Sequence, residues 1–346
     1  MSNRTTKQQP PERKSKQDQH LITPFQTLRD LPTQLDQAQC VLHKHEILIC
    51  GGRNEQTCYS YDTLKNEYKF ICDYPSHVKL HGHCVMRLID NNNKDRNQIT
   101  LLSFGSMSYG KNKHTLVMKY VSVWSNILNK SNEPNNYNQW VPFTDNHNHS
   151  IIIGRDDDDY AGACALIGGK NNNLLFITYY LDNISVFDLN SFQFIKYDKL
   201  PIIDLIWYHC FISTSKNEQG QEMMKTNKQN YQMLLFCKKT GLSIEYDEDN
   251  NNFQFHQLHV CDDIEQLNRY AYVCINDTIL FFGGLNNGIG SKLLHKYLIR
   301  EDKLVILENT LPCPLYGCVA ILNEEDNHIY TSLEEKITKG HHYQLT

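Results

Sequence analysis

An internal repeat of about 45 residues limits what this chain can fold into more than any other feature of its sequence. Each unit is marked by a cysteine followed by an apolar residue, at Cys40, Cys84, Cys164, Cys210, Cys274 and Cys318. Successive markers lie 44, 80, 46, 64 and 44 residues apart, so two units carry polar insertions. The sequence therefore predicts a repeat protein in which each unit packs mainly against its neighbours.

Each unit contains short apolar runs separated by Asn, Gly, Asp and Lys clusters, a pattern typical of strands and turns. A second run follows each cysteine, at 47–50, 99–104, 174–177, 233–236, 279–282 and 328–330. A third run ends in an aromatic residue, namely Tyr61, Tyr120, Phe187, Tyr246, Tyr297 and Tyr343. In four units an apolar residue follows seven positions later, as Tyr68 follows Tyr61, and indicates a fourth strand. We therefore expect an all-β, six-bladed propeller with four-stranded antiparallel blades.

Two units resemble the kelch repeat. The matching residues are Ile49-Cys50-Gly51-Gly52 with Tyr61 behind them, and Phe281-Phe282-Gly283-Gly284 with Tyr297 behind them. The second unit keeps only Phe104-Gly105, and three other units lack the glycines. The resemblance implies a kelch-type propeller over residues 24–346 whose loops on one face bind partners. The WD40 alternative is weaker, because none of the three tryptophans precedes an aspartate.

The two ends of the chain carry separate expectations. Residues 1–23 are rich in Gln, Lys, Ser and Pro, which predicts a disordered polar tail. The last unit ends after its third strand, whereas residues 25–32 resemble the fourth strands of other units. We expect this N-terminal strand to complete the last blade and close the ring.

Charge and composition narrow the range of partners. The net charge of −5 and a pI near 6.3 give no electrostatic support for a nucleic-acid or anionic-membrane partner. No secretory signal or membrane-spanning run is visible, so we expect a cytoplasmic or nuclear protein, and a monomer.

Candidate chemistry is sparse. The six marker cysteines are expected to be small buried residues rather than ligands, because the blades hold them apart. The pairs His81/His83 and His147/His149 suggest a metal site only weakly, and the acidic run 156–159 is expected to be a solvated loop. We find no nucleophile, phosphate-loop or dinucleotide motif, and expect no catalytic residue, metal or cofactor.

Surface residues carry the functional prediction. The loops between second and third strands and those between blades share one face, and they contain Tyr, Trp and Arg residues suited to interfaces. The predicted partner-binding residues are Arg53, Tyr109, Lys111, Trp207, Tyr208, Tyr270, Asn286 and Asn287. We expect a non-enzymatic protein-interaction scaffold or substrate-recognition module. The alternative is a propeller enzyme acting on a sugar or other small molecule, which predicts paired carboxylates or clustered histidines at a polar channel mouth.

Overall fold

The computed structural model describes residues 25–89, 97–125, 136–214, 231–260, 264, 267–332 and 336–341. The predicted tail, residues 1–23, and the aromatic residue Tyr343 lie outside these residues. Within the described residues the strands form six four-stranded antiparallel sheets and one two-stranded hairpin, and most sheets follow the chain order directly.

The strands of each sheet follow one another from the inside of the molecule to its outside. The first two sheets contain β2 (Gln39–His43), β3 (Glu46–Gly52), β4 (Glu55–Asp62) and β5 (Glu67–Asp73), then β6 (Cys84–Leu88), β7 (Gln98–Gly105), β8 (His114–Val121) and β9 (Val141–Pro142). The next two contain β10 (Cys164–Gly168), β11 (Leu174–Tyr179), β12 (Asn183–Asp188) and β13 (Gln193–Lys199), then β14 (Cys210–Ser213), β15 (Tyr231–Cys237), β16 (Thr240–Asp247) and β17 (Asn252–Gln257). The fifth contains β18 (Ala271–Ile275), β19 (Thr278–Phe282), β22 (Leu294–Leu298) and β23 (Lys303–Ile306), with a small hairpin of β20 (Leu285–Asn286) and β21 (Ile289–Gly290).

The remaining sheet joins segments far apart in the sequence. It contains β24 (Ala320–Asn323), β25 (His328–Ser332), β26 (Lys336–His341) and, on its outer side, β1 (Phe25–Asp30). Strand β1 pairs antiparallel with β26, with Phe25 opposite Gly340 and Gln26 opposite Lys339. This is the segment that resembles the other fourth strands in sequence.

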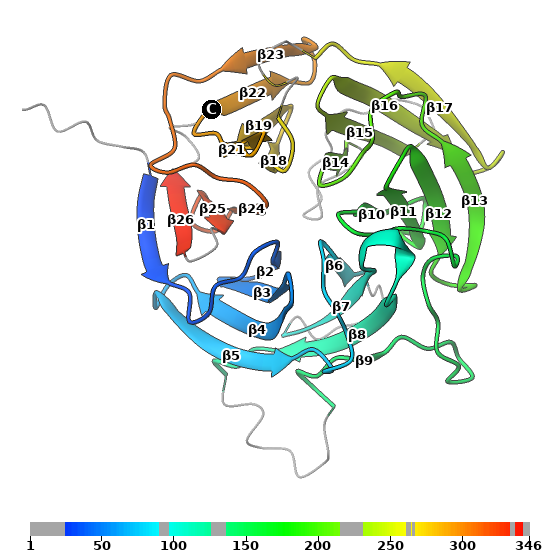
Figure 1. The fold of residues 1–346 in the computed structure, drawn as a ribbon. Coiled ribbons are helices and arrows are strands. Elements are labelled where there is room, and N and C mark those ends of the chain that lie inside the picture. Colours follow the sequence, from blue (N-terminus) through cyan, green and yellow to red (C-terminus); the bar gives the residue numbers. More distant parts are fainter. Residues whose placement is uncertain are drawn as a thin grey trace, which may run out of the picture.

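The sheets stand radially around a common axis (Figure 1). Contacts between innermost strands run from β2 to β6, β10, β14, β18 and β24, and from β24 back to β2. The fold is therefore an all-β propeller with four-stranded antiparallel blades, and this part of the prediction is confirmed. No helix among the described residues is long and apolar enough to cross a membrane.

The aromatic residues predicted on the third strands form the centre of the blades. Tyr61, Tyr120, Phe187, Tyr246 and Tyr297 are each at most 2% exposed. The predicted pairs are also register partners: Tyr61 lies opposite Tyr68, and Tyr246 lies opposite Phe253. Pairs of aromatic side chains at such positions stabilise a sheet directly, which explains the seven-residue spacing.

A repeated polar contact fixes the turn after these aromatics. The hydroxyls of Tyr61 and Tyr246 donate to the side-chain oxygens of Asn66 and Asn251, at 2.8 and 2.7 Å. Both asparagines have positive φ, a conformation that Asn tolerates better than most residues. The turn and the buried ring therefore stabilise each other.

The cysteine marker is only partly in register. Cys84, Cys164 and Cys210 each begin an innermost strand, but Cys274 is the fourth residue of β18 and Cys318 precedes β24. The thiols of Cys84 and Cys164 donate to the carbonyls of Ala163 and His209, in the residues that lead into the next blade. In the fifth sheet Ala271 occupies the first position, so any small residue satisfies the packing there. Cys84 and Cys210 are buried as expected, whereas Cys40, Cys164, Cys274 and Cys318 are only partly buried, so the expectation of buried marker cysteines was wrong for these four.

Candidate functional site

A ring of six backbone positions surrounds the axis where the chain enters the innermost strands. Each position lies two or three residues before such a strand and has a positive φ: Gln37, Gly82, Gly162, Tyr208, Arg269 and Gly317. Backbone hydrogen bonds link neighbouring members, from Gly162 N to Gly82 O at 2.9 Å and from Tyr208 N to Gly162 O at 2.7 Å. Three positions are glycine, which adopts positive φ without strain, and three carry side chains.

We call the opening surrounded by these six positions the axial mouth. The Tyr208 side chain lies across it. Its hydroxyl donates to Gln37 Oε1 at 2.7 Å, although the two residues belong to different blades. A Cβ atom placed on Gly82 or Gly162 would lie 2.6 or 2.7 Å from Tyr208 atoms, so the two glycines provide the space for the ring. Burial is the main reason why the pKa of Tyr208 rises to about 12, so the hydroxyl stays protonated and remains a donor.

Arg269 stacks on the aromatic side of the mouth. Its guanidinium carbon lies 4.6 Å from the centre of the Tyr208 ring and 5.6 Å from that of Trp207. No carboxylate among the described residues forms an ion pair with Arg269, so its N–H groups are available to an anion. Stacked arginines lose little freedom on binding, which suits them to carboxylate recognition.

A cleft of about 130 Å³ opens beside Arg269. It is lined by His81, Ser108, Tyr109, Asp159, Ala161, Tyr180, Trp207, Tyr208 and Arg269. Burial first, and then the positive charges of Arg53 and Arg269, lower the pKa of His81. The imidazole is therefore neutral at physiological pH and acts as a hydrogen-bonding group.

Asp159 organises the loop on the other side of this cleft. Its two carboxylate oxygens accept the backbone N–H groups of Tyr109 at 2.7 Å and Ala161 at 3.0 Å. Its neighbour Asp158 is 4% exposed and forms an ion pair with Arg155. The acidic run is therefore partly structural, and the expectation of a wholly solvated loop was wrong for these two residues.

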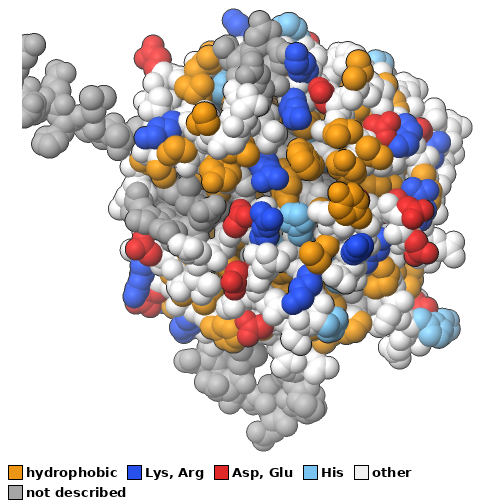
Figure 2. Space-filling model, viewed as in Figure 1, with side chains coloured by type: hydrophobic (Ala, Val, Ile, Leu, Met, Phe, Trp, Pro, Cys, Tyr) orange, Lys and Arg blue, Asp and Glu red, His pale blue; other side chains and the backbone are white. Residues whose placement is uncertain are grey.

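An apolar patch continues the cleft outward over the third blade. We use this name for Leu181, Ile203, Leu205 and Trp207, which are 44%, 101%, 46% and 38% exposed. A hydrogen bond from Ile206 N to Leu181 O holds its two loops together. Figure 2 shows hydrophobic side chains gathered beside the charged groups at the middle of this face. Grouped exposed apolar side chains of this kind mark interaction sites more often than scattered ones do.

The structure brings some of the predicted residues together and separates others. Tyr109, Trp207 and Tyr208 line the cleft. The positive charge of Arg53 is close enough to His81 and Tyr208 to act on the pKa of each in the lowering direction. Lys111, Asn286 at the end of β20 and Asn287 after it line neither the cleft nor the axial cavity. Tyr270 is only 4% exposed and its hydroxyl donates to Phe236 O at 2.7 Å, so it packs between blades.

Sequence reasoning missed several residues of the site. Arg269, His81 and Asp159 line the cleft, and Ile203 is the most exposed member of the apolar patch. Arg269 had a usable signal, because it precedes its innermost strand by the same two residues as Tyr208. Ile203 had none, since one apolar residue in a loop does not reveal its exposure.

In the two histidine pairs, the side chains of His81, His83 and His149 have separate hydrogen-bonding partners. His81 Nδ1 lies 3.4 Å from Ser108 Oγ, whereas His83 is buried with its Nε2 3.0 Å from Cys50 O. His149 Nδ1 lies 3.0 Å from Asp145 Oδ2 on an exposed turn. Within the described ranges, no group of three or more His, Cys, Asp or Glu side chains is placed to hold a metal ion.

A smaller cavity of about 90 Å³ lies on the axis next to Tyr208. Its lining includes Gln37, Cys164, His209, Tyr272 and Cys318. Burial lowers the pKa of His209 to about 3, and Thr178 Oγ1 lies 2.6 Å from its Nε2. The His209 side chain that lines this cavity is therefore uncharged at neutral pH.

The fold and the mouth define the class as a β-propeller whose blade junctions build an axial site. A comparison with solved structures agrees on the fold: the chain is similar to a propeller protein titled "Structure of YjhT", with a TM-score of 0.55 and 12% sequence identity. The match covers 90% of this chain and 95% of that one. No family model matches the chain, and no curated protein matches it in sequence.

Proposed function

We propose that this chain is a non-enzymatic, kelch-type propeller that binds a protein partner on the face carrying the axial mouth. The observation that supports this most is the position of the apolar patch directly beside Arg269, through their shared residue Trp207. The guanidinium is held in place by two aromatic rings and has no ion pair among the described residues. An aromatic and arginine cluster of this kind is a typical centre of a protein interface.

The chemistry of the partner follows from the two parts of the site, the apolar patch and the guanidinium of Arg269. Apolar side chains of the partner would cover Ile203 and Leu205, which are largely exposed in the free chain. A carboxylate of the partner would accept N–H groups of Arg269, with Arg53 adding positive charge nearby. We therefore propose a partner segment that combines apolar side chains with an acidic group.

Two sequence features support the kelch assignment and a closed ring. Gly51, near the end of β3, and Gly283, directly after β19, both have positive φ at the positions of the double glycines of the kelch repeat. We also propose that pairing of β1 with β26 closes the ring, since closure leaves no unpaired edge strand. The free cysteines fit a reducing compartment, so we place the protein in the cytosol or nucleus.

An enzyme acting on a sugar or other small molecule is the second candidate. The polar mouth favours it, because the carboxylates of Asp36 and Asp159 lie close enough to His81 to act on it electrostatically. Against it, the cleft of about 130 Å³ and the axial cavity of about 90 Å³ are small. Sites for small molecules typically measure about 300–1,000 Å³. The sizes therefore favour a surface that binds a protein segment.

Variants of the apolar patch and of Arg269 test the proposal. Partners recovered by affinity purification from the source cell should be lost with Ile203→Asp and with Arg269→Glu. They should be retained with Leu64→Asp, a matched control that changes a 74% exposed apolar side chain in the turn between β4 and β5, on the opposite face. Direct binding of the purified partner should likewise be lost with Ile203→Asp and Arg269→Glu and retained with Leu64→Asp. Changing an acidic residue of the partner to lysine should restore its binding to Arg269→Glu.

Two results would reject the proposal. If Leu64→Asp abolishes binding and the two mouth variants retain it, the opposite face carries the interaction. If a sugar raises the melting temperature of the wild type but not of Arg269→Ala, the small-molecule function is the better one.

A further inference from the structure

Three cysteines lie side by side across the first blade. Cys50 on β3 is directly opposite Cys58 on β4, and Cys58 is directly opposite Cys72 on β5. The cysteines at the start of β6, β10 and β14 instead face Phe104, Thr178 and Phe236. The row in the first blade therefore places one thiol between two others, which the repeat does not require.

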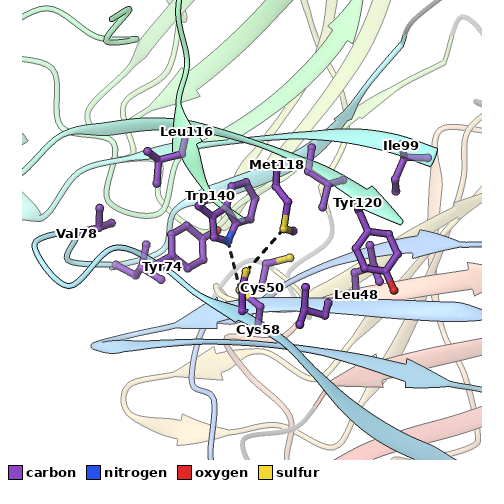
Figure 3. Close-up of a cluster of buried hydrophobic side chains, with 14 residues drawn as sticks. Leu48, Cys50, Cys58, Tyr74, Val78, Ile99, Leu116, Met118, Tyr120 and Trp140 are labelled. Atoms are coloured by element: carbon purple, nitrogen blue, oxygen red, sulfur yellow. Dashed lines mark hydrogen bonds between the residues drawn. The ribbon is translucent and has the colours of Figure 1, made fainter. Parts of the chain in front are cut away.

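The surroundings of the central thiol are rich in hydrogen-bond donors. Trp140 Nε1 donates to Cys58 Sγ at 3.4 Å. The thiols of Cys50 and Cys72 and the backbone N–H of Gly51 also lie within hydrogen-bonding reach of this sulfur. Figure 3 shows Cys50, Cys58 and Trp140 meeting inside the core between the first two blades.

These donors act against burial. Burial alone would raise the pKa of Cys58, but the hydrogen bonds from Cys50, Cys72 and Trp140 lower it well below its usual value. The pKa values of Cys50 and Cys72 are raised, first by the hydrogen-bonding interaction of each with Cys58 and then by burial. The Cys72 thiol itself donates to Met118 Sδ at 3.7 Å. In the folded chain the Cys58 thiol also donates to Gln56 O at 3.9 Å. Its thiolate, with the Trp140 N–H directed at the sulfur, is the form that reacts with an oxidant.

The strand pairing places a possible disulfide partner on either side of Cys58, with a register shift beside each pair, between Cys50 and Gly52 and between Cys58 and Tyr59. Directly opposite residues of antiparallel strands have Cα atoms about 4.5–5.5 Å apart, and disulfides bridge Cα atoms about 4.4–6.8 Å apart. Cys50 and Cys58 are fully buried, whereas Cys72 is 9% exposed on the outer strand. Cys72 therefore marks the side from which a small oxidant reaches the row.

We propose that Cys50, Cys58 and Cys72 form an oxidisable thiol site in which a hydroperoxide converts Cys58 and one flanking cysteine into a cross-strand disulfide. The Cys58 thiolate attacks the peroxide, breaks its O–O bond and becomes a sulfenic acid, while hydroxide leaves. A flanking thiol then attacks the sulfenic sulfur, and water leaves as the disulfide forms. The two thiols lose two electrons in total, and the peroxide gains them.

Trypsin separates the three cysteines, which gives a direct assay. Cleavage after Lys and Arg places them in the peptides 45–53, 54–65 and 70–79. The folded chain is treated with hydrogen peroxide, its remaining thiols are alkylated under denaturing conditions, and the peptides are measured by mass spectrometry. We expect peptide 54–65 linked to one of the other two, with free Cys58 lost about ten times faster or more than free Cys210.

Two kinds of variant keep the test decisive. Cys210→Ala, which changes a fully buried cysteine opposite Phe236, should leave the linked peptides unchanged. Cys58→Ala should remove them, and Cys50→Ala with Cys72→Ala should do the same even if Cys58→Ala fails to fold. The proposal is overturned if Cys58 is recovered as a free thiol after peroxide has consumed the exposed Cys313.

Discussion

The substitution Gly162→Ala tests how the axial mouth is built. An alanine Cβ at this position would lie 2.7 Å from Cδ2 and Cε2 of the Tyr208 ring, and φ there is +72°. A left-handed alanine costs about 1 kcal/mol of stability. Moving the ring and its hydrogen bond to Gln37 costs about 2 kcal/mol more. We therefore expect the free energy of unfolding to fall by about 3 kcal/mol in total.

Gly288→Ala is the matched control for the backbone strain. Its φ is +81°, close to that of Gly162, but no atom lies within 4 Å of the added Cβ. We expect this variant to lose only about 1 kcal/mol, because strain is its single cost. The difference between the two alanine variants therefore measures the clash with Tyr208 alone.

Equilibrium unfolding in urea, followed by circular dichroism, gives the comparison. In a background of Tyr208→Gly the clash disappears, so the loss caused by Gly162→Ala should shrink to about 1 kcal/mol. Equal midpoints for Gly162→Ala and Gly288→Ala would refute the reasoning. The Tyr208 ring would then not be held across the mouth, and the cleft beside it would need a different description.

Three further outcomes are expected. Deleting residues 25–32 should lower the melting temperature far more than deleting 1–23, because β1 pairs with β26 and buries Phe25; equal melts would contradict ring closure. Burial lowers the pKa of His209 from 6.5 to about 3, so the unfolded chain binds more protons below pH 6.5 and stability is lost as pH falls. Between pH 4 and 6, His209→Gln should reduce the slope of the free energy of unfolding against pH by about 1.4 kcal/mol per pH unit. Urea unfolding at each pH gives this free energy. Tyr246→Phe removes the hydrogen bond to Asn251 and should lower the free energy of unfolding by about 1 kcal/mol, whereas an unchanged urea midpoint would show that the contact is not stabilising.

The blades could be predicted because their signals are local and repeated. The seven-residue spacing of Tyr246 and Phe253 corresponds to a register pair whose ring centres lie 4.9 Å apart. The cysteine marker was less reliable, because it reports only that a small residue fits at the start of an innermost strand. Ala271 fits there equally well, so Cys274 in the same strand marked the wrong register.

The axial site could not be predicted in the same way, because it is assembled from residues in different blades. Gln37 and Tyr208 are hydrogen-bonded although 171 residues separate them. The repeat predicts that two such loops lie on one face, but it does not specify which side chains meet over the axis. Trp207, Tyr208 and Arg269 each combined a suitable residue type with a position just before an innermost strand, but nothing in the sequence indicated that their side chains meet.

The six positive-φ positions explain how one scaffold can carry a specific mouth. The backbone conformation is the same at Gly82, Gly162 and Tyr208, so the blade junction does not depend on whether a side chain is present. Each glycine leaves open the space that a neighbouring side chain can enter, as the Tyr208 ring does. Tyrosine and arginine have no intrinsic preference for this conformation, and the strain at Tyr208 and Arg269 must be offset by their contacts. Tyr208 and Arg269 therefore define the mouth through their side chains, although their backbone conformation is one that glycine adopts more easily.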